Sequence, residues 1–374
     1  MSSEHEIIIP TDVLCDIFHL LCDAPIALHD LKNNSHFHEF PWAVGQVCRQ
    51  WRGAFLSYAP LWASFALKPG TFRTAHFVEM HRRATIYLER SGLHSLTIDV
   101  VMPCSGTQTF PKKVWGMLLL CLNRWKRANL KLGGRAALVL DGLLRCRGCM
   151  SSLESITMSI PNFSLALEHY NAFQMAPHLT ELDLTHSGYS GTWQFPWAQL
   201  TKLIINASCK EFGNSYRNNL WGVLCQLENI EELRIITTFQ YITPPSRPPI
   251  IRLPGLRLLE ISLNFAMMFS WFTAPLLECL HIHGGGSAAC NYLYRDQPYE
   301  RELTALIQRS SCHIRRLALQ NCSSRVEEIH TMKTLASVEK LSINFSGSLA
   351  IIQDITEHDG CICLPKLQVL QVAV

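Results

Sequence analysis

One apolar phrase, leucine-x-x-leucine-x-leucine with isoleucine, valine or methionine accepted, recurs nine times in the second part of the chain. Its first residues are Leu153, Leu179, Leu200, Ile230, Leu256, Leu277, Ile314, Val338 and Leu367. Apolar residues at alternate positions predict a strand with one buried face. A unit that recurs every 20 to 50 residues or so is typical of solenoids, in which neighbouring repeats bury each other's apolar faces. We therefore predict a stack of parallel strands over residues 151–374.

The intervals between phrases run from 21 to 37 residues, and most are near the ~20–29-residue period of leucine-rich repeats. The resemblance to these repeats implies an α/β solenoid with a curved parallel sheet and helical or irregular outer returns. Helical spacing predicts outer helices at 218–227 and 299–311, whereas 192–199 and the proline-rich 243–249 predict irregular returns. Six of the nine phrases are followed, three positions past their last apolar residue, by a polar residue that supports the repeat: Asn264 and Cys322, with Ser187, Ser208, Thr238 and Ser346 as weaker substitutes.

The third, fifth and seventh positions of each phrase are predicted to point away from the core, because Cβ atoms alternate between the faces of a strand. A continuous mixed-charge face of this kind is what a solenoid uses to bind another protein. The candidate target-binding residues are Glu181, Asp183, Lys202, Glu232, Arg234, Glu260, His281, His283, Arg316 and Lys340. The alternative is a solvated sheet face without a ligand.

Residues 1–67 have the pattern of a small helical domain. Thr11 and Asp12 suit the start of a first amphipathic helix, and a polar loop follows at 23–40. A second helix is predicted on one continuous stripe formed by Val44, Val47, Cys48, Trp51 and Phe55. A third, short helical turn is predicted to begin at the proline of the segment 60–62.

The order of these elements resembles the F-box, in particular the fungal F-box-like type, over about residues 7–67. The resemblance rests on Ile9-Pro10, the inserted loop, the pattern V-x-x-V-C-R-x-W-R at 44–52 and P-L-W at 60–62. It implies docking onto the SKP-type adaptor of a cullin–RING ubiquitin ligase. By position, the adaptor-binding residues are Pro10, Val13, Leu14, Ile17, Phe18, Val44, Val47, Cys48, Trp51 and Trp62. The alternative is that these residues form the core of a helical cap on the repeat domain.

Between the two regions, residues 68–150 are predicted to form a connector helix and the first irregular repeats. Apolar spacing predicts a helix at 74–91, ended by Gly92, and a strand at 93–100. A further helix is predicted at 113–124.

Composition argues against several other classes of protein. A net charge of +3 with 17% charged residues gives no basic field for nucleic acid. The longest apolar run, at 114–122, is about half of the ~20 residues that a membrane span requires. The acidic start of the sequence lacks the pattern of a secretion signal, so we expect a cytoplasmic or nuclear protein whose fifteen cysteines are reduced thiols.

No pattern of catalytic, cofactor-binding or metal-binding residues emerges from the sequence. The pair Cys146 and Cys149 lacks a second pair of zinc ligands at a fitting distance. Histidines at 29, 36 and 38 belong to a polar loop without ligand spacing. His281 and His283 share one strand face, which leaves open a weak metal or pH-sensitive contact.

The sequence thus predicts a non-enzymatic substrate-recognition subunit of an SCF-type cullin–RING ubiquitin ligase. The helical domain would dock the SKP-type adaptor, and through it a cullin, while the repeats bind an unidentified target protein. The alternative is a non-catalytic repeat scaffold with an F-box-like cap and no role in ubiquitination. An enzyme or metal protein built on the cysteines is a third possibility, which the missing ligand pattern disfavours.

Overall fold

A computed structural model describes residues 9–20, 26–27, 43–67, 74–102, 112–133, 136–160, 169–186, 192–207, 220–237, 250–284, 299–320, 335–344 and 364–373. The chain forms two compact units. Unit 1 comprises Met1–Pro161 and Asn171–His178, and unit 2 comprises Asn162–Tyr170 and Leu179–Val374. Unit 1 therefore includes the first of the nine phrases as well as the N-terminal helices and the connector.

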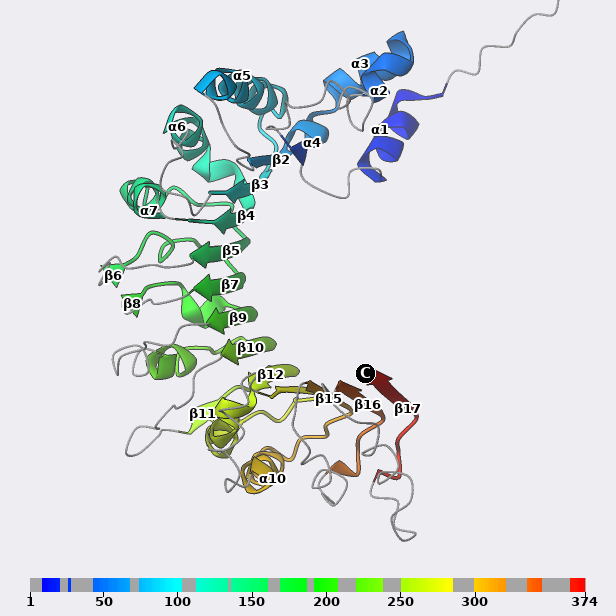
Figure 1. Cartoon of the computed structure of the whole chain (residues 1–374), viewed down its shortest axis with the longest axis vertical. Helices are drawn as coiled ribbons and strands as arrows, with labels where there is room; N and C mark the ends of the chain where they lie inside the picture. Colours follow the sequence, from blue (N-terminus) through cyan, green and yellow to red (C-terminus); the bar gives the residue numbers. More distant parts are fainter. Residues whose placement is uncertain are drawn as a thin grey trace, which may run out of the picture. The chain divides into compact units, whose positions relative to one another are not determined.

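The sheet of unit 1 is parallel and its strands follow one another in chain order (Figure 1). They are β1 (Ile26–Ala27), β2 (Ser64–Leu67), β3 (Leu96–Val101), β4 (Trp125–Lys131) and β5 (Ser155–Ile160). Alternate residues of β3 and β5 are buried, as expected for strands with one apolar face. The connector thus contributes full strands to the same kind of ladder that the phrases predict.

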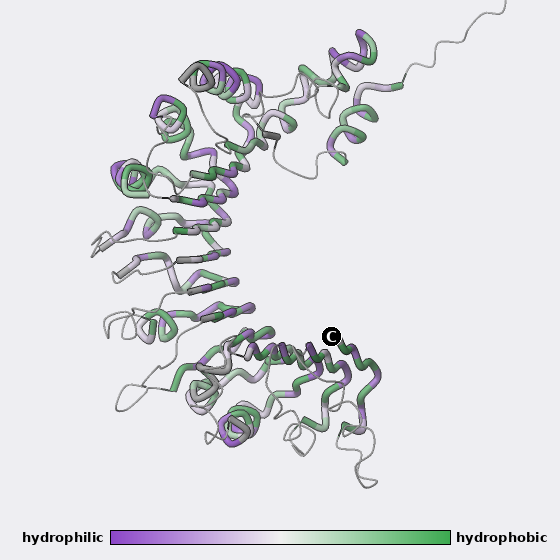
Figure 2. The backbone as a smooth tube through the Cα atoms, in the orientation of Figure 1, coloured by the Kyte–Doolittle hydropathy of each residue, from purple (hydrophilic) through white to green (hydrophobic). Residues whose placement is uncertain are grey.

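Three helices connect the strands of unit 1 and lie on one side of its sheet: α5 (Thr74–Arg90), α6 (Lys112–Leu120) and α7 (Ala136–Arg145) (Figure 1). The predicted helix 74–91 is confirmed, and Gly92 follows it with a positive φ of 54°. The predicted helix 113–124 ends earlier, since α6 gives way to the 3-10 turn η2 (Leu122–Arg124). In Figure 2 the hydrophilic residues of α7 lie on its outer side, and its buried residues include Val139, Leu140 and Leu143.

The N-terminal helices of unit 1 are α1 (Thr11–Leu20), α2 (Val44–Val47), α3 (Arg49–Ser57) and α4 (Ala59–Trp62). The prediction of one continuous helix from Val44 to Phe55 is wrong, because Cys48 adopts an extended conformation with φ −156° and ψ 176°. Its Sγ accepts a hydrogen bond from the Trp51 backbone N–H at 3.5 Å, so Cys48 caps the start of α3. The short helical turn predicted to begin at Pro60 is confirmed as α4, which begins one residue earlier, after Tyr58 at the end of α3.

The eight phrases of unit 2 all form strands of one parallel sheet, in chain order. The strands are β7 (Glu181–His186), β9 (Lys202–Ala207), β10 (Glu232–Thr237), β12 (Leu258–Ser262), β14 (Cys279–His283), β15 (Arg316–Gln320), β16 (Lys340–Asn344) and β17 (Val369–Ala373). Phrase leucines such as Leu203, Leu233 and Leu259 are 0% exposed. The predicted α/β repeat with a parallel sheet is therefore confirmed.

The returns of unit 2 are a mixture of short ladders and helices. Two small parallel pairs join β6 (His169–Tyr170) to β8 (Thr192–Trp193) and β11 (Ile251–Arg252) to β13 (Phe272–Thr273). The 3-10 segments η3 (Trp197–Gln199) and η4 (Leu263–Trp271) replace regular helices. The predicted helix at 299–311 is confirmed as α10 (Tyr299–Ser310), and residues 220–224 are helical within the predicted range 218–227.

Some predicted features lie outside the described residues. These are the loop 28–40, the proline-rich return 243–249 and five of the polar residues that follow the phrases, with Asn264 lacking a described side chain. Among the residues that the structure does describe, no helix has both the length and the apolar character needed to cross a membrane.

Candidate functional site

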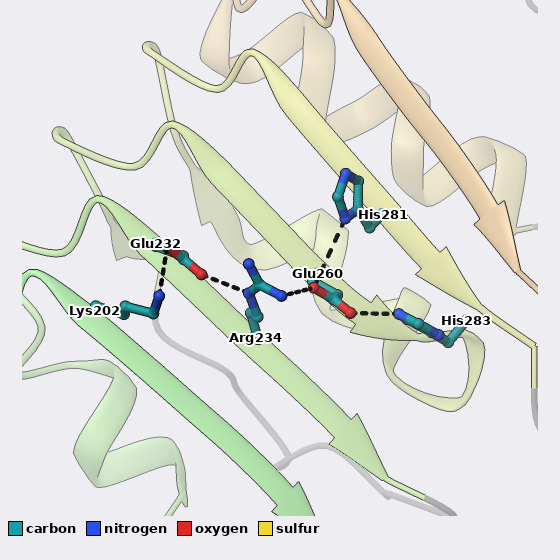
Figure 3. A network of polar contacts seen from close by, with 6 residues as sticks. All are labelled: Lys202, Glu232, Arg234, Glu260, His281 and His283. Carbon is teal, nitrogen blue, oxygen red and sulfur yellow. Dashed lines mark hydrogen bonds and ion pairs between the residues drawn. The ribbon is translucent and has the colours of Figure 1, made fainter. Parts of the chain in front are cut away.

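Six side chains of unit 2 form a charged network across four neighbouring strands (Figure 3). Lys202 on β9 pairs with Glu232 on β10, with 3.3 Å between Nζ and Oε2. Arg234 donates from Nε to Glu232 Oε1 at 2.5 Å. The same guanidinium reaches β12, where its Nη1 lies 3.0 Å from Oε2 of Glu260. Charges therefore alternate in sign along the network, from Lys202 through Glu232 and Arg234 to Glu260.

Glu260 is the centre of this network because histidines of β14 also converge on it. His283 Nε2 lies 2.5 Å from Glu260 Oε1, and His281 Nδ1 lies 3.7 Å from Oε2 (Figure 3). The first separation is a hydrogen bond, whereas the second is too long for one and acts through charge when the imidazole is protonated. The carboxylate is thus held from both neighbouring strands.

Strand register explains why these residues meet. In the parallel ladder Arg234 stands beside Glu260, and Glu260 stands beside His281. All three occupy the fifth position of their phrases, so their Cβ atoms leave the same face of the sheet with a spacing of about 4.8 Å between strands. One polar residue at the same place in consecutive repeats is therefore enough to build a row of contacts.

Burial and neighbouring charges shift the pKa of Glu260 in opposite directions. Its residue is 5% exposed, and desolvation by itself raises the pKa of a carboxyl group. His281 and His283, followed by the charge of Arg234, outweigh this effect and hold the pKa of Glu260 well below its usual range. Glu260 is accordingly a carboxylate throughout the neutral pH range.

The same face is acidic at β7. Glu181 is exposed, and Asp183 is half-buried with an enclosed Oδ1 atom that finds no hydrogen-bond partner among the residues that the structure describes. Burial raises the pKa of Asp183, and the charges of Lys202 and Arg234 counteract it. This end of the sheet thus carries carboxylates that the network does not neutralise directly.

The face is basic at β15 and β16. Arg316 is exposed and Lys340 is half-buried, and the two are register partners on adjacent strands. Arg316 also follows Cys279 of β14 in the same row, and its charge opposes the burial that raises the pKa of the Cys279 thiol. Within the part of the chain that the structure describes, neither Arg316 nor Lys340 forms an ion pair with a carboxylate.

All ten predicted target-binding residues occupy strand positions on this face, which we call the inner face. The structure connects six of them in the network and leaves Glu181, Asp183, Arg316 and Lys340 outside it. One expectation needs correction, since Glu260 was predicted to be presented to a partner but lies buried beneath Arg234, His281 and His283. The sequence identified the face but not this network, which the shared fifth position could have indicated.

The predicted adaptor-binding residues of unit 1 divide into two groups by exposure. Val13 is 43% exposed, Val47 is 61% exposed, and Pro10 and Cys48 are also exposed. Ile17 and Trp51 are half-buried. These residues offer surface on α1, α2 and α3 for contact with another protein.

Two further exposed apolar residues escaped the sequence prediction. Leu20 at the end of α1 is 75% exposed, and Leu56 in α3 is 40% exposed. Periodicity alone does not reveal them, because both have the residue type of a core position.

The other four predicted adaptor-binding residues have no surface to offer, and this corrects the prediction. Leu14, Phe18, Val44 and Trp62 are between 0% and 6% exposed inside unit 1. They provide the interior that a set of short helices needs in order to hold together.

Trp62 is the residue of these four with ring, hydrogen-bond and cation contacts to its neighbours in unit 1. Its ring lies 4.9 Å from that of Phe55 and 4.9 Å from that of Tyr87, and its Nε1 donates to the Phe55 carbonyl at 3.1 Å. The Arg90 guanidinium lies 4.4 Å above the ring. Trp62 therefore joins α4 to α5 instead of facing outward.

The sites considered for metal chemistry are accounted for by local contacts. Cys146 and Cys149 belong to a turn in which the Cys149 N–H donates to the Cys146 carbonyl at 3.1 Å. The pair His281 and His283 points at Glu260. Throughout the described ranges, no group of three or more histidine, cysteine, aspartate or glutamate side chains is arranged to hold a metal ion.

Comparison with models of protein families gave no match, and neither curated proteins nor solved structures matched the chain significantly.

Proposed function

We propose that this chain is a substrate-recognition subunit of an SCF-type cullin–RING ubiquitin ligase. Its N-terminal helices act as an F-box that docks an SKP-type adaptor, and the inner face of unit 2 binds a target protein. The chain performs no chemistry of its own. It raises the effective concentration of target lysines near the conjugating enzyme, in the cytoplasm or nucleus.

The observation that carries the proposal is the exposure of apolar side chains on α1, α2 and α3. Val13, Leu20, Val47 and Leu56 are each between 40% and 75% exposed, although buried aromatic residues complete the interior beside them. Exposed apolar residues also occur singly elsewhere, as at Val78, but these four are carried by three helices that contact one another. Exposed aliphatic residues on short helices are suited to a helix-in-groove contact with another protein.

A repeat scaffold without a role in ubiquitination is the second candidate, and the packing of Trp62 favours it. This tryptophan is fixed between Phe55, Tyr87 and Arg90, as in a helical cap on the repeat stack. The two candidates differ in whether the exposed residues of α1 to α3 contact an adaptor.

Co-purification with an SKP-type adaptor tests the proposal. The Val13→Asp/Val47→Asp variant should lose the adaptor, because both side chains are exposed and a charge there opposes burial in an interface. Val78→Asp is the matched control, since Val78 in α5 is 74% exposed and is not among the predicted adaptor contacts. Equal retention of the adaptor by all three proteins, or failure of the native chain to bind it, would overturn the docking model.

A further inference from the structure

We propose that the inner face of unit 2 binds a partner segment rich in aspartate and glutamate, anchored by Arg316 and Lys340 on β15 and β16. This inference rests on the proposed target-binding role of the inner face and specifies the chemistry of the target.

The arrangement of the two cations carries the inference. Arg316 and Lys340 are register partners on adjacent parallel strands, so their Cβ atoms leave the same face about 4.8 Å apart. Like charges placed side by side in a sheet repel each other. No carboxylate among the described residues pairs with either of them. An anion supplied by a partner would relieve this repulsion.

Two adjacent cations without an acid occur only at this end of the inner face, among the described residues. Between β9 and β12 each cation has an acid within reach, as in the contacts of Lys202 with Glu232 and of Arg234 with Glu260. Beyond Glu260 the alternation stops, and the charges of the inner face are those of Arg316 and Lys340 together with His281 and His283 when protonated. The network is therefore self-neutralised, whereas the β15–β16 end is basic.

Small side chains adjoin the two cations. The next residues that face the same way are Ala318 on β15 and Ser342 on β16, which are register partners of each other. Ala318 is 8% exposed and so is itself covered by neighbouring side chains, whereas Arg316 is exposed and Lys340 is half-buried. A carboxylate of a partner would therefore meet the two cations at their exposed ends.

The opposite end of the inner face sets the direction of the bound segment. Glu181 and Asp183 lie on β7, six strand steps before β16 and so about 29 Å away along the sheet. These acids repel an acidic segment, while Arg316 and Lys340 attract it. The acidic residues of the partner should therefore lie over β15 and β16, and any basic residues of the same segment over β7.

Fluorescence polarisation of a labelled oligo-glutamate peptide, added to the full chain, tests the proposal. An oligo-glutamine peptide of the same length is the matched probe. We expect the oligo-glutamate peptide to bind, the oligo-glutamine peptide not to bind, and the affinity to fall with added salt. The Arg316→Gln/Lys340→Gln variant should bind the oligo-glutamate peptide at least about tenfold more weakly, since it loses two charge-assisted contacts.

A matched control variant separates a local site from a general effect of charge. Arg252→Gln/Arg257→Gln removes the same charge from two exposed residues of unit 2 that lie outside the inner-face rows. It should keep the affinity of the native chain. No binding of the oligo-glutamate peptide, or an equal loss in both double variants, would overturn the proposal. Tighter binding of a single-stranded oligonucleotide that depends on Arg316 and Lys340 would replace it with a nucleic-acid site.

The adaptor measurement keeps the two proposals distinguishable. The Arg316→Gln/Lys340→Gln variant should retain the SKP-type adaptor, because both changes are in unit 2 and the proposed docking residues are in unit 1. A chain that binds the adaptor but not oligo-glutamate contradicts only the acidic partner. A chain that binds oligo-glutamate through Arg316 and Lys340 but no adaptor contradicts only the docking role.

Discussion

The imidazole of His283 and the carboxylate of Glu260 are joined across adjacent strands, with 2.5 Å between Nε2 and Oε1. From the strand on the other side, Nη1 of Arg234 lies 3.0 Å from the second oxygen, Oε2, which is held by this ion pair and has no hydrogen-bond partner among the described residues. Glu260 is 5% exposed and is contacted from both neighbouring strands. The stability of unit 2 should therefore depend on the contacts of this carboxylate.

Replacement of Glu260 by glutamine should destabilise unit 2 substantially. The change removes the carboxylate charge beside Arg234, but Arg234 is 33% exposed and keeps its pair with Glu232, so we expect a loss of about 1–3 kcal/mol, below that for a fully buried pair. Urea unfolding of the native and Glu260→Gln proteins measures the difference. Glu278→Gln is the matched control, because Glu278 is 42% exposed in its 4.0 Å pair with Arg257. This control should lower the unfolding free energy by no more than about 0.5 kcal/mol. Equal stability of both variants would contradict the central role of Glu260.

The contribution of Glu260 should also depend on pH. Its pKa in the folded chain lies below that of an unfolded glutamate, about 4.3, because of His281, His283 and Arg234. The stabilisation is therefore fully present above that unfolded value and is lost as the pH falls toward the folded one. The difference in unfolding free energy between native protein and Glu260→Gln should shrink as the pH falls below about 4.3. A difference that grows as the pH falls below about 4.3 would have the wrong sign.

The sequence predicts the repeat strands well because their signal is local. Alternating leucines in each phrase determine both the strand and its buried face, as Leu233 and Leu259 illustrate. The identity of the inner-face residues follows from the same alternation. Contacts between strands are different, because whether Glu260 faces solvent or lies beneath Arg234 and His283 depends on register and on side chains from other repeats.

The N-terminal helices show a second limit of sequence patterns. Apolar spacing cannot distinguish a residue that packs inward from one on the outer surface of a short helix, as the contrast between Val44 and Val47 shows. Nor does it reveal a break in the backbone such as that at Cys48, since the stripe is compatible with an uninterrupted helix.

Trp62→Ala should destabilise unit 1 without acting directly on adaptor binding. The tryptophan is 1% exposed and contacts Phe55, Tyr87 and Arg90, and truncation of a buried aromatic residue typically costs about 3–5 kcal/mol. Thermal unfolding measures the loss, and Trp62→Phe, which keeps an aromatic ring, should lose less. Under conditions where Trp62→Phe is folded, its affinity for the adaptor should equal that of the native chain. A selective loss of affinity in the folded Trp62→Phe protein would instead make Trp62 an interface residue.

Lys340→Gln should leave the stability of unit 2 unchanged or increase it slightly. The substitution removes the repulsion with its register partner Arg316, and such cross-strand terms are about 0.2–1 kcal/mol. Urea unfolding at low salt gives the strongest effect, because added salt screens the repulsion. Lys202→Gln is the opposite case, since Lys202 pairs with Glu232 at 3.3 Å and its replacement should not stabilise the protein. A clear loss of stability in Lys340→Gln would show that Lys340 has a stabilising role that the described contacts do not include.

The relative stability of Cys48→Ala and Cys48→Ser should show whether the helix is interrupted at Cys48 or continuous. As the cap of α3, Cys48 accepts the Trp51 N–H, so Cys48→Ala should reduce stability by about 0.5–1 kcal/mol. Cys48→Ser should retain or improve it, because serine is among the best residues at the start of a helix. In an uninterrupted helix the order would reverse, since alanine has the highest helix propensity and serine is about 0.5 kcal/mol worse. Thermal unfolding of the two variants, with Arg49→Ala inside α3 as a control, therefore decides between two helices and one.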